Sequence, residues 1–503
     1  MNILIYFDGE NKRDSIGNSL WNIEKCLAVT CFNALIREDY KLKIILPENS
    51  LSNYTLWGKK PTSTIFKETT INKNELDFFM NNVEITTIAD DELINCFKQA
   101  ISIDEIYGLD LEGRIDSNSF EKIKKLILKK TGDFKPDIVV SYLLNLNFLR
   151  KIFEGKMVLV TEWSIFSRYP LPPSIYFDPI GSIKMSFLNT FTDDIKNYPI
   201  TEKDNQDVEL FKKGITAELA KKLDISDIVK PYLGKYRKLI LCPLTGVFYS
   251  EDMCPFVDDH AVIRYVMKHV APDIGVIFTV HPGPKTVSIS EICYYREKYP
   301  NFVYIEELNK SFMPSVALFP YVNAIINLAS MTGTMAMLWD LPIIPLYGHY
   351  NDWMKDGDSL NDLETVLSNP IVNKNNRIYW YFTHFAIFEN RFSDGQFYKQ
   401  YFEKKLKSFD KKGITFDFYE QNEDFVKISN YILETVNTAN IEDPNKKDIL
   451  LFGKIKIVSI VKFEKDINIY FLKSKVIRIS FSQKKLYFCG IPIMCWKNKN
   501  LKK

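Results

Sequence analysis

Short apolar runs rich in β-branched residues alternate with amphipathic helical stretches through the first 230 residues. The runs predict strands at Asn2–Phe7, Leu42–Pro47, Val83–Ala89 and Pro136–Leu143. Before the last of these, Phe120, Ile123 and Ile127 recur at helical spacing, and Gly132 is placed to end the helix. Such alternation is typical of a parallel sheet covered by helices.

The alternation starts again after residue 238. Further strands are predicted at 239–244, 274–282, 302–307, 322–330 and 341–348, with helices at 258–272 and 334–340. Two consecutive α/β halves of this size predict two facing Rossmann-like domains, with a ligand in the crevice at the carboxyl ends of their strands. We therefore expect one domain at 1–230 and a second at 231–440.

The last segment, 441–503, has a different pattern. Lysines interrupt β-branched and aromatic residues at about period two, which predicts a small β-rich appendage. From Lys446 to Lys503 there are 15 Lys and Arg against 3 Asp and Glu, a net charge of +12, so the rest of the chain carries −10. Two interpretations remain open: lysines on the solvent face of a sheet, or a basic surface for anionic lipid or polymer.

Composition excludes several classes of protein. The chain of 503 residues is 46% hydrophobic and 25% charged, and its net charge of +2 argues against a general nucleic-acid binder. Its 8 cysteines form no C-x-x-C pair, which indicates free thiols in a reducing compartment. No signal-like segment and no apolar run of roughly 18 residues is found, so we expect a cytoplasmic protein that meets a membrane at most peripherally.

A strand end in the second half carries the first candidate for phosphate binding. An apolar strand that begins at Val276 ends on His281 and Pro282, and Lys285 follows in the turn after it. A histidine there can donate a hydrogen bond to a phosphate in the crevice, and the proline fixes the turn that presents it. The alternative is a histidine bonded only to backbone at the end of a strand.

A hydroxyl-rich turn lies about fifty residues further on. Ser330, Thr332, Gly333 and Thr334 stand between a predicted strand and an apolar helix. Free backbone N–H groups and the helix dipole favour an anion at such a place, although a simple helix cap gives the same pattern. Because this turn and His281 fall in the same half, together they predict a nucleotide phosphate site.

Other phosphate-binding and metal-binding motifs are missing from the sequence. There is no G-x-x-x-x-G-K-[ST] and no G-x-G-x-x-G after the first strand, which argues against a P-loop enzyme or a nicotinamide dehydrogenase. No His, Cys or acidic cluster has metal-ligand spacing. We therefore expect neither a metal nor another cofactor, and assign the neutralisation of phosphate to His281, Lys285 and the helix start.

Four ordered segments resemble one family. "TEWSIFSRYPLPPSIYFDPIGS", "LCPLTGVFYSEDM", "VHPGPK" and "INLASMTGTMAMLWDLPIIPLYGHYNDW" are similar to the motifs of bacterial capsule and lipopolysaccharide β-Kdo transferases, over Val160 to Asp358, about two fifths of the chain. The resemblance implies a GT-B fold and transfer, with retention, of a 3-deoxy-ulosonic acid from CMP. Transferases for nine-carbon sugars such as pseudaminic acid share the pattern, so the donor stays open. The positions matching the family are Glu162, Phe166, Arg168, Ser174, Asp178, Gly181, Ser330, Gly333, Ala336, Pro342, Gly348, Tyr350 and Trp353.

The resemblance also implies roles for individual residues. Glu162, at a strand end of the acceptor-side domain, is the expected general base, and Asp252 is the expected nucleophile. Glu251 is a rival for that role, and a plain loop carboxylate is a further alternative, because Phe248 stands where the family has a Gln four residues before its catalytic Asp.

Two further positions are assigned to the sugar, and a carboxylate is assigned to the fold. Arg168 is expected to clamp the sugar carboxylate, and Tyr350 to contact the substrate. Asp178 is expected to fix a loop rather than to react.

The predicted partners follow from this chemistry. They are a CMP-sugar donor and an oligosaccharide or lipid-linked glycan acceptor of capsule or lipopolysaccharide, with the basic tail against the inner membrane and no nucleic acid. Two alternatives remain: an inverting GT-B transferase for CMP-sialic acid or a UDP-sugar, and a non-catalytic glycan-binding subunit of a capsule export system.

Overall fold

The structure is a computed structural model. It describes residues 1–7, 29–48, 73–97, 100, 102–111, 113–142, 146–164, 166–167, 169–181, 186–244, 256, 258–280, 287–308, 313–328, 332–346, 352–369, 373–439, 446–451, 455–463, 466–471, 474–480, 485–488 and 491–495. The chain forms two compact units. Met1–Ile305 with Met313–Thr438 make the first, and Glu306–Phe312 with Ala439–Lys503 make the second.

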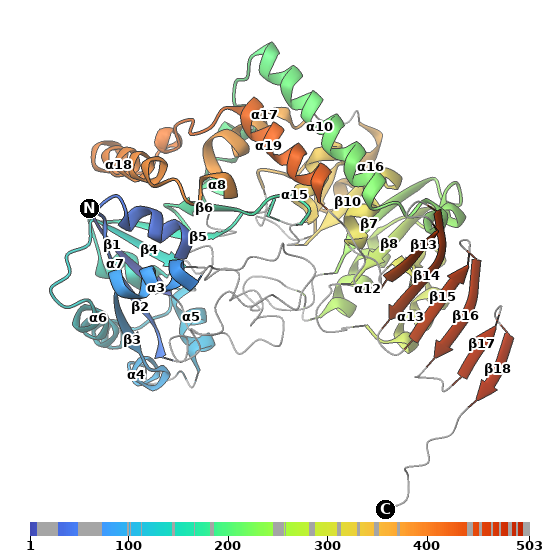
Figure 1. Cartoon of the computed structure of the whole chain (residues 1–503), viewed down its shortest axis with the longest axis horizontal. Coiled ribbons are helices and arrows are strands. Elements are labelled where there is room, and N and C mark those ends of the chain that lie inside the picture. The colour runs from blue at the N-terminus through green and yellow to red at the C-terminus, as the bar shows by residue number, and fades with distance from the viewer. Residues whose placement is uncertain are drawn as a thin grey trace, which may run out of the picture. The chain divides into compact units, whose positions relative to one another are not determined.

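The first sheet of unit 1 has seven strands in the order β12-β6-β5-β4-β1-β2-β3 (Figure 1). They are β1 Asn2–Phe7, β2 Lys41–Pro47, β3 Glu84–Ile88, β4 Ile138–Tyr142, β5 Met157–Trp163, β6 Ser174–Asp178 and β12 Ile387–Phe388. The first five are parallel, and β6 runs antiparallel to both β5 and β12. The order 3-2-1-4-5-6 is that of a Rossmann-like sheet, with its switch point between β1 and β4.

Helices of the first half connect these strands. They are α3 Lys73–Asn82, α4 Asp90–Ile94, α5 Ile103–Leu111, α6 Ser117–Thr131 and α7 Asn147–Ile152. The predicted helix before β4 is α6. Asp116 caps its first turn by accepting from two backbone N–H groups, and Ile123 and Ile127 are buried on one face. Gly132 follows it at φ 60°, a conformation that suits glycine, so the predicted end of this helix is confirmed.

The second sheet of unit 1 is entirely parallel, in the order β11-β10-β7-β8-β9. Its strands are β7 Lys238–Pro243, β8 Ile274–Thr279, β9 Phe302–Tyr304, β10 Ala324–Asn327 and β11 Ile343–Pro345. Its helices are α12 Asp259–His269, α13 Ile289–Lys298, α14 Pro314–Ala317, α15 Thr332–Ala336 and α16 Leu363–Ser368. From β7 the chain adds β8 and β9 on one side, and it then returns to add β10 and β11 on the other side of β7. This order puts the switch point between β7 and β10. The predicted fold class, two successive Rossmann-like α/β halves, is confirmed.

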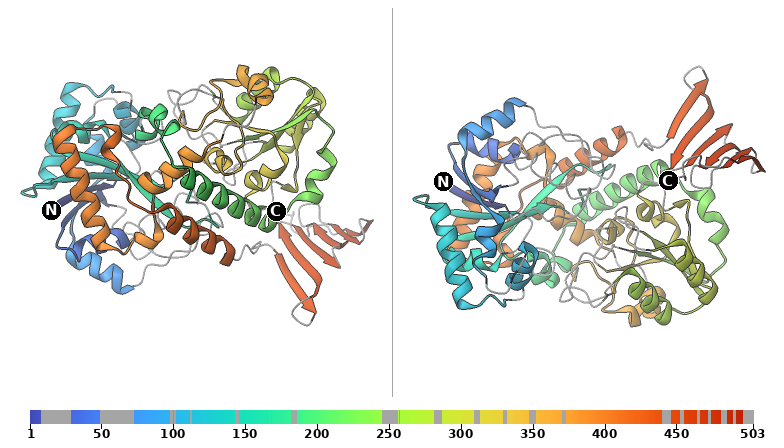
Figure 2. Two further views of the ribbon diagram at one scale, coloured as in Figure 1. Left: turned by 90° about the horizontal axis from the view of Figure 1, so that it is seen from above. Right: turned by 90° about the horizontal axis from the view of Figure 1, so that it is seen from below.

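A group of helices connects and follows the two sheets. They are α8 Phe187–Thr190, α9 Thr192–Lys196, α10 Glu202–Lys222, α11 Ser226–Val229, α17 Asn375–Trp380, the π-helical turn η8 Tyr381–Phe385, α18 Gly395–Lys412 and α19 Phe425–Thr438. Figure 2 shows α10 as one long helix with α19 packed beside it. The first four of these lie between the two sheets in the sequence, and the last four follow the second sheet and lead the chain back to the first.

The C-terminal part of unit 1 completes the first sheet. β12 pairs with β6, and Tyr398 on α18 contacts Cys31 of the first half through a 2.9 Å distance between its hydroxyl and Sγ. The Tyr419 hydroxyl donates to the backbone oxygen of Phe177 in β6. Parts of 381–419, a range that the sequence assigned to the second domain, therefore contact the first half; the exact boundaries at 230 and 440 stay predictions.

Unit 2 contains a six-stranded antiparallel sheet in which each strand pairs with the next. Its strands are β13 Lys446–Leu451, β14 Ile455–Phe463, β15 Asp466–Phe471, β16 Ser474–Ser480, β17 Lys485–Phe488 and β18 Ile491–Cys495. The predicted β-rich appendage is confirmed. Across the described part of the chain, the helices are all too short or too polar to span a bilayer.

Buried ion pairs tie the connecting helices to the second half. Lys212 on α10 lies 2.5 Å from Asp340, just before β11, and Lys374 lies 3.0 Å from Asp356. Asp356 also accepts from the backbone N–H of Ile343, the first residue of β11. The Lys374 side chain is fully buried and that of Asp356 is 6% exposed, so water screens the attraction between the two charges very little.

Replacing Lys374 by Met should strongly destabilise unit 1. The substitution keeps the volume but leaves Asp356 buried with less compensation, and breaking a buried pair in this way costs about 3–5 kcal/mol. Urea unfolding followed by tryptophan fluorescence measures the loss. Lys221→Met, at an exposed pair with Glu218, is the matched control and should change the midpoint far less. Equal effects of the two substitutions would contradict the importance of the buried pair.

Candidate functional site

Four of the predicted site residues lie in the part of the chain that the structure describes: Glu162, Thr332, Gly333 and Thr334. The others lie outside the described residues, namely Arg168, Glu251, Asp252, His281, Pro282, Lys285, Ser330 and Tyr350. The joint cleft predicted for Glu162 and His281 therefore stays a prediction.

Glu162 is the one residue of β5 that is partly rather than fully buried. It stands one position before the carboxyl end of the strand, directly opposite Tyr176 of β6 in the antiparallel register. The Tyr176 hydroxyl donates a 3.0 Å hydrogen bond to Glu162 Oε2. Directly opposed residues point to the same face of a sheet, so the two neighbouring strands together fix where this carboxylate lies.

The surroundings of Glu162 change its acidity. Burial raises its pKa from 4.5 to about 7, and the hydrogen bond from Tyr176 acts in the opposite direction because it favours the ionised form. A carboxylate with a pKa near neutrality accepts a proton far better than an ordinary one and is still ionised in a large fraction of molecules. Glu162 thus has the properties of a general base.

Asp178, the last residue of β6, is fully buried. Its Oδ1 accepts from the backbone N–H groups of Ile180 and Gly181, and its Oδ2 accepts from that of Phe187 at 2.8 Å. Burial raises its pKa to about 7, against these hydrogen bonds and the charge of Arg150. Both oxygens are occupied in holding the turn between β6 and α8, so the expected structural role of Asp178 is confirmed.

Tyr381 links the end of β5 to the segment around Trp353, which follows β11 in the sequence. Its hydroxyl donates to Ser164 Oγ at 2.8 Å, two residues beyond Glu162, and its ring is stacked on Trp353 with centroids 5.5 Å apart. Trp353 lies on the segment that runs back beside β11, because the Asp356 N–H donates to the Ile343 oxygen at the start of that strand. A single tyrosine therefore contacts the residue that follows β5 and a segment that comes after β11 in the sequence.

Sequence reasoning missed both Tyr176 and Tyr381. They belong to aromatic stretches, "SIYFD" and "YWYFTHF", whose pattern is that of ordinary core residues. A signal exists only for Tyr176: in an antiparallel hairpin anchored by Asp178, the register places a residue of β6 opposite Glu162.

The hydroxyl-rich turn follows β10 at the switch point of the second sheet. A Cβ added to Gly333 would lie 2.4 Å from the side-chain nitrogen of Asn327, the last residue of β10. Glycine is therefore required here for close packing of α15 on the strand end. The Thr334 side chain is buried, and its hydroxyl has no hydrogen-bond partner among the described residues. The phosphate-binding role of this turn stays a prediction.

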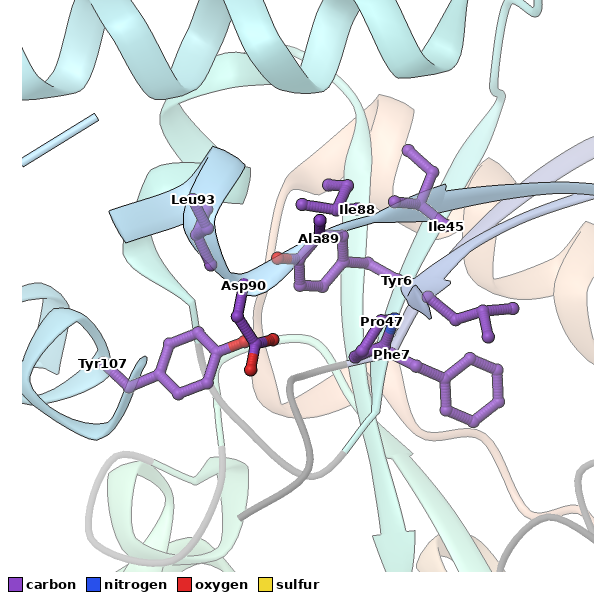
Figure 3. A pocket seen from close by; sticks show the side chains of 10 residues that line it. Tyr6, Phe7, Ile45, Pro47, Ile88, Ala89, Asp90, Leu93 and Tyr107 are labelled. Carbon is purple, nitrogen blue, oxygen red and sulfur yellow. The ribbon is translucent and has the colours of Figure 1, made fainter. Parts of the chain in front are cut away.

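A hollow lies at the carboxyl ends of β1, β2 and β3 (Figure 3). Tyr6, Phe7, Pro47, Asp90 and Tyr107 line it, and Asp90 and Tyr107 point toward one another in Figure 3. The space inside that is open to water is about 10 Å³, which holds roughly one water molecule. A sugar ring does not fit into it, so the hollow is not assigned to a substrate.

The other potentially reactive side chains of the described residues, cysteines and a histidine among them, lie in surroundings typical of a structural role. Among these residues no three His, Cys, Asp or Glu side chains gather closely enough for a metal, and metal independence stays a prediction. Cys31, Cys96, Cys242 and Cys293 are free thiols, of which the first three are buried. Burial lowers the pKa of His384 to about 4, so it is neutral at physiological pH.

No protein-family model and no curated protein matches the chain. Solved structures similar to it include two KpsC enzymes of Thermosulfurimonas dismutans. The β-Kdo 2,7 transferase is 13% identical, with 58% of this chain and 90% of that chain covered and a TM-score of 0.32. The β-Kdo 2,4 transferase is 15% identical, with 50% and 81% covered and a TM-score of 0.32. A UDP-GlcNAc 2-epimerase from Neisseria meningitidis is 13% identical, with 87% and 100% covered and a TM-score of 0.27.

Gly333→Ala should destabilise the second half, because the new methyl group requires the buried Asn327 side chain to move, at about 1–3 kcal/mol for overpacking. Thermal unfolding checks this. The control is Gly108→Ala in α5, where an added Cβ has nothing within 4 Å, and where alanine should stabilise the helix by about 0.5–1 kcal/mol. A Gly333→Ala protein as stable as wild type would show that this turn is not tightly packed.

Proposed function

We propose that the protein is a glycosyltransferase that moves a 3-deoxy-ulosonic acid, Kdo-like or nonulosonic such as pseudaminic acid, from CMP to a capsule or lipopolysaccharide glycan with retention of configuration. The observation that carries this proposal is Glu162, a carboxylate at a strand end with a pKa of about 7, in a segment that resembles the β-Kdo transferase motif. The contacts of Tyr381 with Ser164, after β5, and with Trp353, after β11, support a site to which both halves contribute.

The topology of the second sheet supports a donor site there. The segments that carry Asp252, His281 and the turn at 330–334 follow β7, β8 and β10 in the sequence. These three strands are parallel neighbours in the order β10-β7-β8, so their carboxyl ends lie on one edge at the switch point. We assign binding of the CMP phosphate to His281, Lys285 and the hydroxyl-rich turn.

The first chemical step forms a covalent intermediate. The Asp252 carboxylate attacks the anomeric carbon, the bond from that carbon to the phosphate oxygen breaks, and CMP leaves with the bonding electron pair. Arg168 holds the carboxylate of the sugar and Tyr350 contacts the sugar. Donors arranged around the phosphate stabilise the charge that develops on it.

The second step transfers the sugar. An acceptor hydroxyl loses its proton to Glu162 while its oxygen attacks the anomeric carbon, and the Asp252 carboxylate is released with the electrons of the bond to the sugar. Two inversions at one carbon give net retention. The proton on Glu162 then passes to water, which restores the base.

Product analysis separates this proposal from its rivals. CMP-ulosonic acids are screened by thermal shift, and the product formed with acceptor is examined by NMR for its anomeric configuration. An inverted linkage, or transfer from a UDP-sugar, identifies the inverting alternative. Donor or glycan binding without any release of CMP identifies a non-catalytic export subunit and contradicts the proposal.

Glu162→Gln should lower transfer about 100- to 10,000-fold, because the amide cannot take up the proton, while CMP binding is retained because the phosphate contacts are assigned to the other half. Asp252→Asn should abolish transfer in the same way. CMP release and calorimetric CMP binding measure the two properties. Glu154→Gln, at an exposed position before β5, is the control and should keep wild-type turnover; such turnover in Glu162→Gln would remove Glu162 from the mechanism.

The basic appendage is proposed to hold the enzyme at lipid-linked acceptor on the inner face of the membrane. Removal of residues 446–503, which carry a net charge of +12, should reduce binding to vesicles containing anionic lipid and spare transfer to a soluble acceptor. Vesicle sedimentation at low and high salt measures the first property. Unchanged sedimentation would contradict the membrane role, and lost transfer to soluble acceptor would assign the segment to the fold instead.

A further inference from the structure

The carboxylate of Glu162 has a single hydrogen-bond donor among the described residues, the hydroxyl of Tyr176. This donor reaches Oε2 at 3.0 Å, and no contact of the described residues occupies Oε1. A carboxylate that is held by one oxygen keeps a defined orientation and has its other oxygen available to accept a proton.

Tyr176 is itself held in place by the C-terminal part of unit 1. It is 7% exposed, and its ring is stacked on Phe385 with centroids 4.9 Å apart and planes at 26°. Phe385 ends the π-helical turn η8, the same turn in which Tyr381 donates to Ser164. One five-residue turn therefore supports both strands beside Glu162, and π-helical turns often occur at functional sites.

We propose that Tyr176 is a positioning residue for Glu162: its hydroxyl holds Oε2 so that Oε1 receives the proton of the acceptor hydroxyl, and Phe385 keeps Tyr176 in that position. The inference rests on the proposed function of Glu162 as the general base. It assigns a role in the reaction to a residue of β6 and to a turn that lies more than 200 residues later in the chain.

The electrostatic surroundings are consistent with this role. Tyr176 is the titratable group that contacts Glu162, and Asp178 of β6 and Tyr381 of η8 act on Tyr176 in turn. Burial and the neighbouring carboxylates raise the pKa of Tyr176, so it stays a neutral donor at all physiological pH values. Its hydrogen bond is the described contact that favours ionised Glu162 against the effect of burial.

The experiment removes this hydroxyl and measures the titration of Glu162 directly. Wild type and Tyr176→Phe are labelled with ¹³C at the glutamate side-chain carboxyl, and the Glu162 resonance is assigned by its absence in Glu162→Gln. In Tyr176→Phe the midpoint should rise from about 7 by about one pH unit, since a hydrogen bond to a charged group has that magnitude. The pH profile of kcat/KM for CMP release should move upward by the same amount, with activity recovered at high pH.

Tyr398→Phe is the matched control. It also removes one buried tyrosine hydroxyl, which contacts Cys31 Sγ at 2.9 Å rather than the carboxylate of Glu162. The Glu162 midpoint should not change in this variant. Phe385→Leu, which removes the stacked ring and keeps the Tyr176 hydroxyl, should raise the midpoint by a smaller amount and also provides a test if Tyr176→Phe does not fold.

The outcomes separate the inference from the proposed function. An unchanged Glu162 midpoint in Tyr176→Phe, or an equal shift in Tyr398→Phe, overturns the positioning role even if the enzyme transfers sugar. If the midpoint shifts in Tyr176→Phe but Glu162→Gln transfers sugar fully, the hydrogen bond exists but Glu162 is not the general base. That result overturns the proposed function, whereas the contact itself is confirmed. A raised midpoint and a pH profile displaced by the same amount support both.

Discussion

Glu162 stands in a strand whose other residues are all buried, and a single described hydrogen bond, from Tyr176, favours its charge there. Burial alone would keep such a carboxyl group protonated at neutral pH, whereas full exposure would leave it a weak base. Its pKa of about 7 results from burial, which raises the pKa, and from the Tyr176 hydrogen bond, which lowers it. The proposed chemistry requires this balance, and the neighbouring strand and the π-helical turn are arranged so that they maintain it.

The balance depends on the late return of the chain to the first sheet. After the second half is complete, the turn Tyr381–Phe385 packs on the β5 and β6 strand ends, β12 extends the sheet, and α18 covers it. The buried pairs of Lys212 and Lys374 fix the start of this return to the second half. A break in these contacts would therefore disturb the residues that hold Glu162 in place.

Much of the fold could be predicted from the pattern of the sequence. The parallel strands of both sheets, α6 with its end at Gly132, and the β-rich appendage follow from apolar periodicity and from turn residues, because local propensity and burial agree there. The position of Glu162 near the end of an apolar strand and the structural role of Asp178 could be predicted, since a carboxylate after an apolar strand is conspicuous, whereas the role of Glu162 as a base stays a proposal. The supporting tyrosines could not, because an aromatic residue that donates a hydrogen bond has the same sequence pattern as one that only fills a core.

The sequence by itself determined the strands and helices, the order in which they occur and the edge of each sheet at which polar residues gather. Only the tertiary structure decided that Tyr176 faces Glu162, that Gly333 lies against Asn327 and that Tyr381 contacts both Ser164 and Trp353. The physical reason is distance along the chain. Periodicity reports contacts a few residues apart, whereas the contacts that set the acidity of Glu162 depend on strand pairing and on a turn more than 200 residues away, which only folding brings together.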